Sequence, residues 1–489
     1  MTLILTEYFL FFTFVLLSFY LLPQQHQWKL LLIASIFFYM ANIPGYIAVP
    51  ALIIFISYSA GILIEKANRP AARKAILVIS LLANIGILVF FKYINFITES
   101  LFGMMNLISR GTFQPETAVR NPWVVSMLIP LGISYITFQA IGYTIEIYRA
   151  HHSAEKNLGV FSAYLMFFPK ILSGPIERAH NFIPQLYVKK CFDYRQVTDG
   201  LKLIAWGLFK KLVIAARLAD MTNVVFSKPE MYAGAPLIAA SLLFTIQLYA
   251  DFSGYTDIAI GSANALGFQL MRNFDSPFIA KSTTELWRRW HISLSTWFGE
   301  YVYNPIAIAT RNWDRWAVVY ASLVTFLILG LWHGPTWNFA MFGLLQGIVL
   351  SVEFLTRKTR KKIASRLPEA FNSCFGVCFT FAFFSFALIF FKAGTFADAV
   401  YIITHLFSFS GDVFKAHSLL AVYVKSQILI AAALICFMLV VEYLGRNYDV
   451  KGIIASRPAI QRWAIYYAVI FTIVIFGIFT ESQFIYFKF

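Results

Sequence analysis

Residues 330–338 read GLWHGPTWN, and they lie in a segment from Trp316 to Val352 that contains no Asp, Glu, Lys or Arg. His333 lies in the middle of this segment, and an ionisable side chain inside hydrocarbon usually faces a protein interior or a water-filled cavity. The apolar run before it, Val318 to Trp332, is shorter than the ~20 residues of a straight spanning helix, and Gly334-Pro335 breaks the helix. We therefore expect His333 to lie where a helix ends inside the membrane, lining a cavity suited to chemistry.

The composition of the whole chain is that of a polytopic membrane protein. Of its 489 residues 59% are hydrophobic and 13% are charged, whereas soluble domains carry about 25% charged residues. The first apolar run, Tyr8 to Leu22, follows Glu7 and no basic residue, so we expect a first membrane helix and not a cleavable signal peptide. The net charge of +16 does not indicate nucleic-acid binding, because the basic residues are spread through loops between apolar runs. The four cysteines show no zinc or disulfide spacing, so no metal site is expected.

Apolar runs predict an all-α polytopic membrane protein of about 10–12 transmembrane helices. The clearest runs cover residues 8–22, 30–45, 47–64, 76–97, 123–147, 370–393, 427–444 and 463–480. Placing the basic loops in the cytoplasm puts both ends of the sequence outside. No repeat or linker is visible, so we expect one membrane domain over residues 1–489. Its predicted parts are peripheral helices (1–125), a catalytic core (126–355) and C-terminal helices (356–489).

Three segments depart from solid apolar runs. Gly200 to Leu218 predicts an amphipathic helix that lies in the cytoplasmic interface. Residues 232–268 predict a hairpin of helices, and residues 98–121 predict a loop. The polar face of the amphipathic helix is expected to hold Lys202, Lys210, Lys211 and Arg217.

An aromatic and basic cluster, Trp287-Arg288-Arg289-Trp290-His291, is unusual beside membrane segments. One interpretation is an interfacial belt in which Trp anchors the chain and Arg meets lipid headgroups. The other is a cytoplasmic rim in which Arg288, Arg289 and Trp290 bind the phosphates and adenine of a nucleotide-bearing donor. A functional role is favoured for His291, because it precedes a second Trp-rich approach to the membrane.

Two further motifs place polar groups next to hydrophobic helices. In residues 249–257, YADFSGYTD, Asp251 is predicted to orient a histidine or pair with an arginine, and a helix cap is the alternative. In residues 130–139, PLGISYITFQ, the side chain of Gln139 is predicted to hydrogen-bond between helices, in preference to lining a tunnel. Residues 173–178 are predicted to form a re-entrant loop. A neutral imidazole at His333 is suited to taking a proton from a hydroxyl that attacks a thioester.

These motifs resemble those of a known family. WRRWHISLSTWFGEYVYNP (287–305) with GLWHGPTWNFAMFG (330–343) resembles the membrane-bound O-acyltransferase family. PLGISYITFQ (130–139), SGPIERAHNFIPQL (173–186), YADFSGYTDIAIG (249–261) and the terminal FIYFKF are similar to its bacterial branch that includes the alginate O-acetylation membrane protein. One position departs from that branch, since Gln346 stands where a histidine is expected; we interpret it as a structural position.

The resemblance implies a fold, an activity and a set of site residues. The fold is a ring of membrane helices, with re-entrant and interfacial helices, around a central tunnel in which funnels from both sides meet. His333 matches the catalytic histidine and His291 the second histidine of the family. The donor, acetyl-CoA, is expected to pass Arg288, Arg289 and Trp290, with Asp251 and Asn338 as orienting groups.

The same resemblance implies where the acetyl group goes. In this branch it crosses the bacterial inner membrane to a secreted or membrane-anchored SGNH-type partner enzyme, which esterifies an extracellular polysaccharide such as alginate. One alternative keeps the fold but transfers D-alanine from a carrier-protein thioester to a cell-wall polymer. Another alternative is a transporter that carries out no covalent chemistry.

Overall fold

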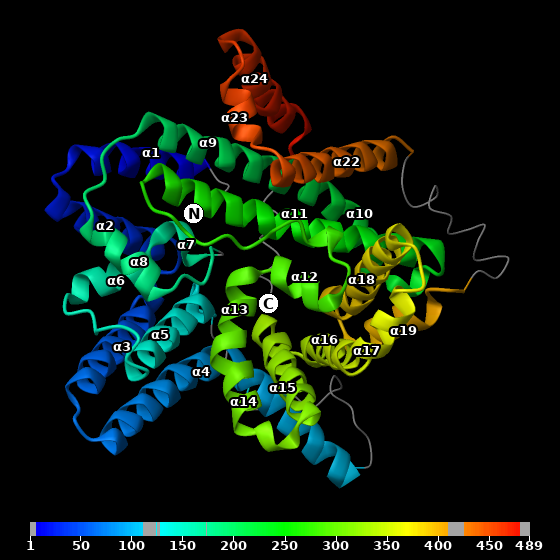
Figure 1. Cartoon of the computed structure of the whole chain (residues 1–489), viewed down its shortest axis with the longest axis horizontal. Coiled ribbons are helices and arrows are strands. Elements are labelled where there is room, and N and C mark those ends of the chain that lie inside the picture. Colours follow the sequence, from blue (N-terminus) through cyan, green and yellow to red (C-terminus); the bar gives the residue numbers. More distant parts are fainter. Residues whose placement is uncertain (1–5, 111–123, 125–127, 173, 409–424, 480–489) are drawn as a thin grey trace. The chain divides into compact units, whose positions relative to one another are not determined.

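The computed structural model describes residues 6–110, 124, 128–172, 174–408 and 425–479, and within these ranges every regular element is a helix (Figure 1). The predicted all-α class is therefore confirmed. The chain divides into two compact units. The first unit comprises Met1–Val197 with Ser262–Leu270, and the second comprises Thr198–Gly261 with Met271–Phe489. The predicted division into peripheral, core and C-terminal parts stays a prediction.

The first unit is built from helices that follow the predicted apolar runs. They are α1 (Thr6–Leu21), α2 (Gln24–Asn42), the 3-10 turn η1 (Pro44–Tyr46), α3 (Ala48–Lys66), α4 (Pro70–Arg110), α5 (Ile133–Tyr148), α6 (Leu158–Met166), α7 (Phe168–Ile171) and α8 (Ala179–Tyr187). Helices α3, α4 and α5 pack against one another, and α2 packs against α6. Residues 98–110 of the predicted loop are helical instead, because Leu101, Met104, Met105 and Ile108 continue the apolar spacing of α4. The rest of that predicted loop lies outside the described residues.

A buried amine joins two of the polar motifs within the first unit. Lys170 is 1% exposed, and its Nζ donates to Oε1 of Gln139 at 2.5 Å. The rings of Tyr164 and Phe182 lie 4.2 and 4.6 Å from the same nitrogen. Gln139 therefore makes the interhelical hydrogen bond that was predicted for it.

The second unit contains the remaining helices and both predicted catalytic histidines. Its elements are α9 (Tyr194–Leu208, whose first turn belongs to the first unit), the π-helical segment η2 (Phe209–Ala215), α10 (Ala216–Phe226), α11 (Ala235–Ala265, whose last turn belongs to the first unit), α12 (Thr283–Arg289), α13 (Ile292–Phe298), the π-helical segment η5 (Gly299–Tyr303), α14 (Asn304–Ala309), α15 (Arg315–His333), α16 (Trp337–Leu355), α17 (Arg357–Ala364), α18 (Glu369–Lys392), α19 (Phe396–His405), α22 (Lys425–Asn447), α23 (Val450–Ala455) and α24 (Ala459–Phe476). Short 3-10 turns are η3 (Pro229–Met231), η4 (Pro277–Ile279) and η6 (Arg311–Trp313).

The predicted amphipathic helix was expected to place four cations on its polar face, and for two of them this prediction is wrong. Lys210 and Lys211 are 3% and 2% exposed, not on a solvated face. They lie in η2, where the π-helical winding changes which face of the helix each side chain occupies. Lys211 pairs with Asp251, and Lys210 pairs with Asp257 at 2.5 Å.

The hairpin predicted within residues 232–268 is also wrong, because α11 runs without a break from Ala235 to Ala265. The polar stretch in its middle is not a turn, since the two lysines of η2 neutralise its carboxylates. Close approach of the two segments needs glycine on both sides. A Cβ on Gly207 would lie 2.5 Å from the Gly254 carbonyl oxygen, and one on Gly254 would lie 2.7 Å from that of Gly207.

By length and composition, eight helices of the described residues are suited to crossing a membrane. They cover Pro44–Lys66, Pro70–Met105, Ala235–Ala265, Arg315–His333, Trp337–Leu355, Glu369–Lys392, Ser426–Asn447 and Ala459–Phe476. Helix α1 is apolar but has only 16 residues. The number of spans counted in this way is below the about 10–12 predicted, because α1 and α5 have 16 residues each and α11 is one helix where a hairpin of two was predicted.

Candidate active site

His333 is the last residue of α15, as the sequence predicted for a helix that ends at this position. Gly334 is extended, with φ −166°, and Pro335 after it cannot continue the helix. A Cβ on Gly334 would lie 2.2 Å from the ring of Phe339. A side chain at position 334 would therefore clash with the ring of Phe339, so this position needs glycine.

Glycines also bring α15 and α16 together along their length. A Cβ on Gly330 would lie 2.3 Å from the carbonyl oxygen of Phe339, and one on Gly343 would lie 2.2 Å from that of Phe326. The two helices pack directly against each other. This hairpin fixes the backbone that carries His333.

Aromatic rings surround the imidazole of His333, which is 4% exposed. Its ring centroid lies 5.0 Å from that of Trp332, 5.2 Å from that of Phe391 and 6.1 Å from that of Phe342. Phe391 belongs to α18, so three helices of the second unit contribute to this enclosure. Such surroundings exclude water and strengthen any electrostatic contact made there.

His291 lies between α12 and α13 in the left-handed conformation, with φ 46° and ψ 52°. This conformation costs a residue other than glycine about 1–2 kcal/mol, so neighbouring contacts must hold it. The backbone N–H of Ile292 donates to the carbonyl oxygen of Asn273 at 2.9 Å. The side chain of Asn273 also contacts the imidazole, with Oδ1 at 3.2 Å from Nδ1. Burial lowers the pKa of His291 to about 3, so this imidazole is neutral at pH 7.

One indole ring contacts both predicted catalytic histidines. The ring of Trp332 lies 6.0 Å from that of His291 and 5.0 Å from that of His333, in edge-on geometry in both cases. The two histidines come from separate parts of the sequence, and the structure brings them to the same aromatic group. Trp332 is therefore a ring that both histidines share.

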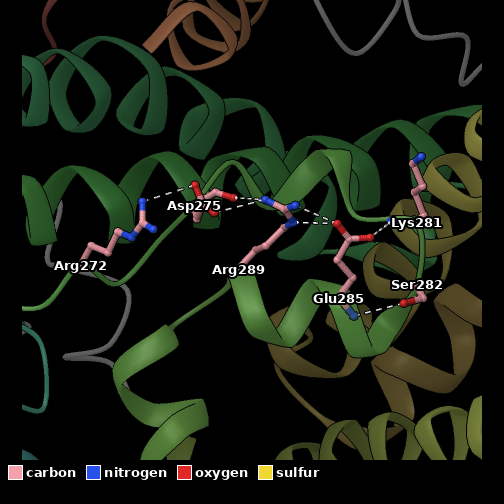
Figure 2. Close-up of polar contacts among 6 residues, drawn as sticks. All are labelled: Arg272, Asp275, Lys281, Ser282, Glu285 and Arg289. Atoms are coloured by element: carbon pink, nitrogen blue, oxygen red, sulfur yellow. Dashed lines mark hydrogen bonds and ion pairs between the residues drawn. The ribbon is translucent and has the colours of Figure 1, made fainter. Parts of the chain in front are cut away.

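The two arginines of the predicted donor site differ in their surroundings. Arg289 is part of an alternating row of charges, which Figure 2 shows. Its Nη2 lies 2.8 Å from Oε1 of Glu285 and its Nη1 lies 3.2 Å from Oδ2 of Asp275. Arg288 is exposed and, within the ranges given above, takes part in no hydrogen bond or ion pair. Arg288 is therefore available to a ligand, whereas Arg289 is already engaged.

Glu285 shows how strongly this row is coupled. Burial acts to raise the pKa of its carboxyl, but the hydrogen bond from the Lys281 amide and the Arg289 guanidinium outweigh burial and lower that pKa. The amide of Lys281 donates to Oε2 of Glu285 at 2.9 Å, as Figure 2 also shows. Ser282 caps α12 by accepting from the Glu285 amide. The row thus fixes the short helix that carries the arginines.

Trp290 is 3% exposed and lies inside an aromatic cluster. Its ring centroid lies 5.0 Å from that of Phe384, 5.3 Å from that of Phe274 and 5.9 Å from that of Tyr249. An adenine can stack on this indole only if neighbouring rings move. Its predicted contact with a donor stays a prediction.

The two predicted orienting groups lie in different surroundings. Asp251 is 3% exposed and pairs with a lysine, Lys211, where the sequence predicted a histidine or an arginine as its partner. Asn338 lies in the first turn of α16, near the end of α15, and its Nδ2 donates to the carbonyl oxygen of Ala393 at 3.0 Å. Its Oδ1 is buried and accepts no hydrogen bond from the described residues. The structure therefore leaves Asn338 with an unused acceptor.

Gln346, which departs from the pattern of the resembling branch, is fully buried. Its Oε1 accepts a hydrogen bond from Nε1 of Trp287 at 3.1 Å. This bond links α16 to α12 and agrees with the interpretation of a structural position.

Sequence reasoning missed Asn273, which lies 18 residues before His291 in a segment without regular secondary structure. A single asparagine carries no periodic pattern, so nothing local in the sequence indicates its partner. In the described parts of the chain, no three His, Cys, Asp or Glu side chains come together as metal ligands would.

Comparison with known proteins shows which family this chain belongs to. Residues 3–394 match the model of MBOAT, the membrane-bound O-acyltransferase family. The chain is 34% identical over 347 residues to the probable alginate O-acetylase AlgI of Azotobacter vinelandii, covering 71% of this chain and 67% of that protein. It is 30% identical over 408 residues to the peptidoglycan O-acetyltransferase of Helicobacter pylori, covering 78% of this chain and 74% of that protein. A teichoic acid D-alanyltransferase of Streptococcus thermophilus is 31% identical over 277 residues, covering 52% of this chain and 66% of that protein.

Proposed function

Because the chain belongs to the membrane-bound O-acyltransferase family, we propose that it moves acetyl groups from cytoplasmic acetyl-CoA across the membrane for O-acetylation of an extracellular polysaccharide. Family membership and its apolar helices make it a multi-pass membrane acyltransferase. The observation that carries the proposal is the enclosure of His333 at the end of α15, beside the indole that also contacts His291. Both histidines lie within the residues that match the family.

In this proposal His333 acts on a hydroxyl and a thioester that meet at the end of α15. The hydroxyl oxygen attacks the thioester carbon, the C–O bond forms and the C–S bond breaks. His333 takes the hydroxyl proton and passes it to the departing sulfur, so CoA leaves as the free thiol and the imidazole is regenerated. In the alternative, a nitrogen of His333 attacks the thioester carbon, the C–S bond breaks, and CoA leaves as the thiol with the imidazole proton. The hydroxyl then attacks the acetyl-imidazole, the N–C bond breaks, and the hydroxyl proton returns to the imidazole.

On the donor side, Arg288 is the group that we propose to contact the phosphates of CoA. It is exposed and is not engaged in the row of charges that holds Arg289. On the acceptor side, we propose that the acetyl group passes to an SGNH-type enzyme, which transfers it to the polysaccharide. The relatives' names supply the class of acceptor, since alginate and peptidoglycan are both polysaccharides. We propose the bacterial inner membrane as the location.

A second function is favoured by one specific observation, the match to a teichoic acid D-alanyltransferase. In this alternative the donor is a D-alanyl thioester on a carrier protein. The match to the O-acetylases is longer and covers more of this chain. We therefore place acetyl transfer first.

The test uses the full chain in liposomes, with acetyl-CoA outside, a polysaccharide inside as the hydroxyl acceptor, and release of free CoA thiol as the readout. We expect the wild type to release thiol, and the His333→Gln and His333→Ala variants to lose this activity by about 100-fold or more, as for a removed general base. His152→Gln, at an exposed histidine, is the matched control and should retain wild-type activity. A D-alanyl carrier protein, offered in place of acetyl-CoA, serves as the second donor. Wild-type activity in His333→Gln would overturn the catalytic assignment, and activity with the carrier alone would overturn the donor.

A further inference from the structure

Asn273 is a buried residue that contacts His291 through its side chain and the next residue, Ile292, through its backbone carbonyl oxygen. It is 1% exposed and lies between α11 and η4. Its Oδ1 lies 3.1 Å from the backbone nitrogen of Ser293, 2.7 Å from Oγ of Ser293 and 3.2 Å from Nδ1 of His291. Three polar groups therefore converge on one atom of the Asn273 side chain.

The backbone amide of Ser293 identifies that atom as oxygen. A peptide N–H only donates, so the end of the Asn273 amide that faces it must be the acceptor. The reverse orientation would place an NH₂ group against an N–H, two donors facing each other. Because Oδ1 only accepts, Nδ1 of His291 must be the donor in the contact at 3.2 Å. The neutral imidazole of His291 therefore carries its proton on Nδ1.

This tautomer leaves a lone pair on the other ring nitrogen. Nε2 of His291 is buried and has no hydrogen-bond partner among the residues that the structure describes. The ring itself is held edge-on by Phe252, at 4.6 Å, and by Trp332, at 6.0 Å. Burial keeps the imidazole neutral at pH 7, so the lone pair is not lost to a proton. A buried acceptor without a partner is costly in a folded chain, so a ligand that donates a hydrogen bond to Nε2 would remove this cost.

We propose that Asn273 is the positioning residue that fixes the Nδ1–H tautomer of His291, so that Nε2 accepts a hydrogen bond from a hydroxyl or thiol of the reacting substrates. This inference rests on the proposed acyl transfer and assigns His291 a role separate from that of His333. Asn273 acts through His291 and is not itself a catalytic residue. It also holds the left-handed backbone at His291, through its carbonyl oxygen and the Ile292 amide.

Three variants separate the acceptor role from simple packing. Asn273→Leu removes the acceptor at nearly constant volume. Asn273→Asp keeps an oxygen acceptor for both His291 and Ser293, and it replaces the amide nitrogen, which has no partner among the described residues, by a second carboxylate oxygen. Ser293→Ala removes the other side-chain donor to Oδ1 but leaves the imidazole contact in place.

The decisive readout is the ring-nitrogen NMR spectrum of full-length protein labelled with ¹⁵N at its eight histidines, in nanodiscs at pH 7.5. The signal lost in His291→Gln assigns the residue. We expect a protonated Nδ1 and an unprotonated Nε2 in the wild type, Asn273→Asp and Ser293→Ala, and loss of this pattern in Asn273→Leu. In the thiol-release assay, Asn273→Leu should lower kcat by about 10–100-fold with little change in KM, the usual effect of removing a partner that orients a histidine. Asn273→Asp should restore most of kcat.

An Nε2-protonated wild type would overturn the proposal, and so would an Asn273→Leu protein that keeps the wild-type tautomer and kcat. It is also overturned if Asn273→Asp is as inactive as Asn273→Leu while both keep the wild-type unfolding midpoint. The NMR measurement needs no substrate. If the wild type shows no acetyl transfer, the proposed function fails while the tautomer still decides the role of Asn273.

Discussion

The buried pair of Lys211 and Asp251 allows a direct test of whether Asp251 serves stability or the active site. The two side chains are 3% and 4% exposed and join η2 to α11. Lys211→Met leaves the carboxylate of Asp251 buried without this counter-charge, and Asp251→Asn leaves the ammonium of Lys211 buried without its own. The double variant removes both charges at once.

The expected magnitudes follow from this burial. Breaking a buried ion pair from one side costs about 3–5 kcal/mol, because a charge stays uncompensated in a poorly solvated place. The double variant has no such charge and lacks only the hydrogen bond between these two side chains, a loss of about 1–3 kcal/mol. We therefore expect the double variant to be more stable than either single variant. Lys202→Met is the control, since its pair with Asp199 is 33% and 24% exposed, and such pairs contribute about 0.2–1 kcal/mol.

Unfolding of the purified protein in detergent gives the stability of each variant, and thiol release from acetyl-CoA gives its activity. If Asp251 is structural, the double variant regains both stability and activity relative to the single variants. The reasoning is refuted if Asp251→Asn keeps wild-type stability but loses activity, or if the double variant folds stably and remains inactive. Either result would restore the sequence-based prediction that Asp251 contributes to the site.

Four further predictions concern residues of the second unit. Arg288→Ala should change the free energy of unfolding by less than about 0.5 kcal/mol. It should raise the KM for acetyl-CoA about tenfold, which corresponds to the loss of one charged contact of about 1.4 kcal/mol. An unchanged KM would exclude a contact between Arg288 and the donor. Arg289→Ala should instead destabilise the protein by about 1.5–3 kcal/mol, because its bonds to charged groups are lost, and unchanged stability in urea would contradict this. The pKa of Glu285 lies below its ordinary value of 4.5. The contribution of this carboxylate to the free energy of unfolding is therefore complete above pH 4.5 and is lost as the pH falls through the lower pKa of the folded state. Arg289→Ala should weaken this loss of stability in acid, measured as the unfolding midpoint at a series of pH values. Gly330→Ala should destabilise the protein by about 1–3 kcal/mol through overpacking. Gly45→Ala is the control and should leave the stability unchanged, because nothing lies within 4 Å of the added Cβ. Equal unfolding midpoints for the two variants would refute the close approach of α15 and α16.

Much of the fold was predictable because membrane helices leave a strong local pattern. A long apolar run predicts a helix whatever its partners are, and α3, α18 and α24 follow the predicted runs closely. The errors arose where a helix is stabilised by something distant in the sequence. α11 continues through a polar stretch because Lys210 and Lys211 neutralise its carboxylates. Neither the π-helical winding of η2 nor these ion pairs can be recognised from local periodicity.

For the candidate site, the sequence indicated the unusual residues but not the groups that contact them. His333 and His291 stood out because an imidazole among apolar and aromatic residues is unusual, and the structure places both beside Trp332. Asn273 did not stand out, because its importance lies in a hydrogen bond to a residue in another part of the chain. A sequence shows which groups are unusual, but the partners that orient them appear only when the chain is folded.

Four basic residues of the second unit look alike in the sequence but differ in the structure in whether they are already paired with carboxylates. From the sequence, Lys210, Lys211, Arg288 and Arg289 are alike: each is a cation next to apolar residues. The structure buries the first two against carboxylates and engages Arg289 in a row of ion pairs. A cation that is already neutralised would have to give up its partner before it could bind a phosphate, and that loss would offset much of the new contact. Of these four cations, Arg288 alone has no ion pair to give up in the described part of the chain, which is why we propose it as the contact for an anionic donor.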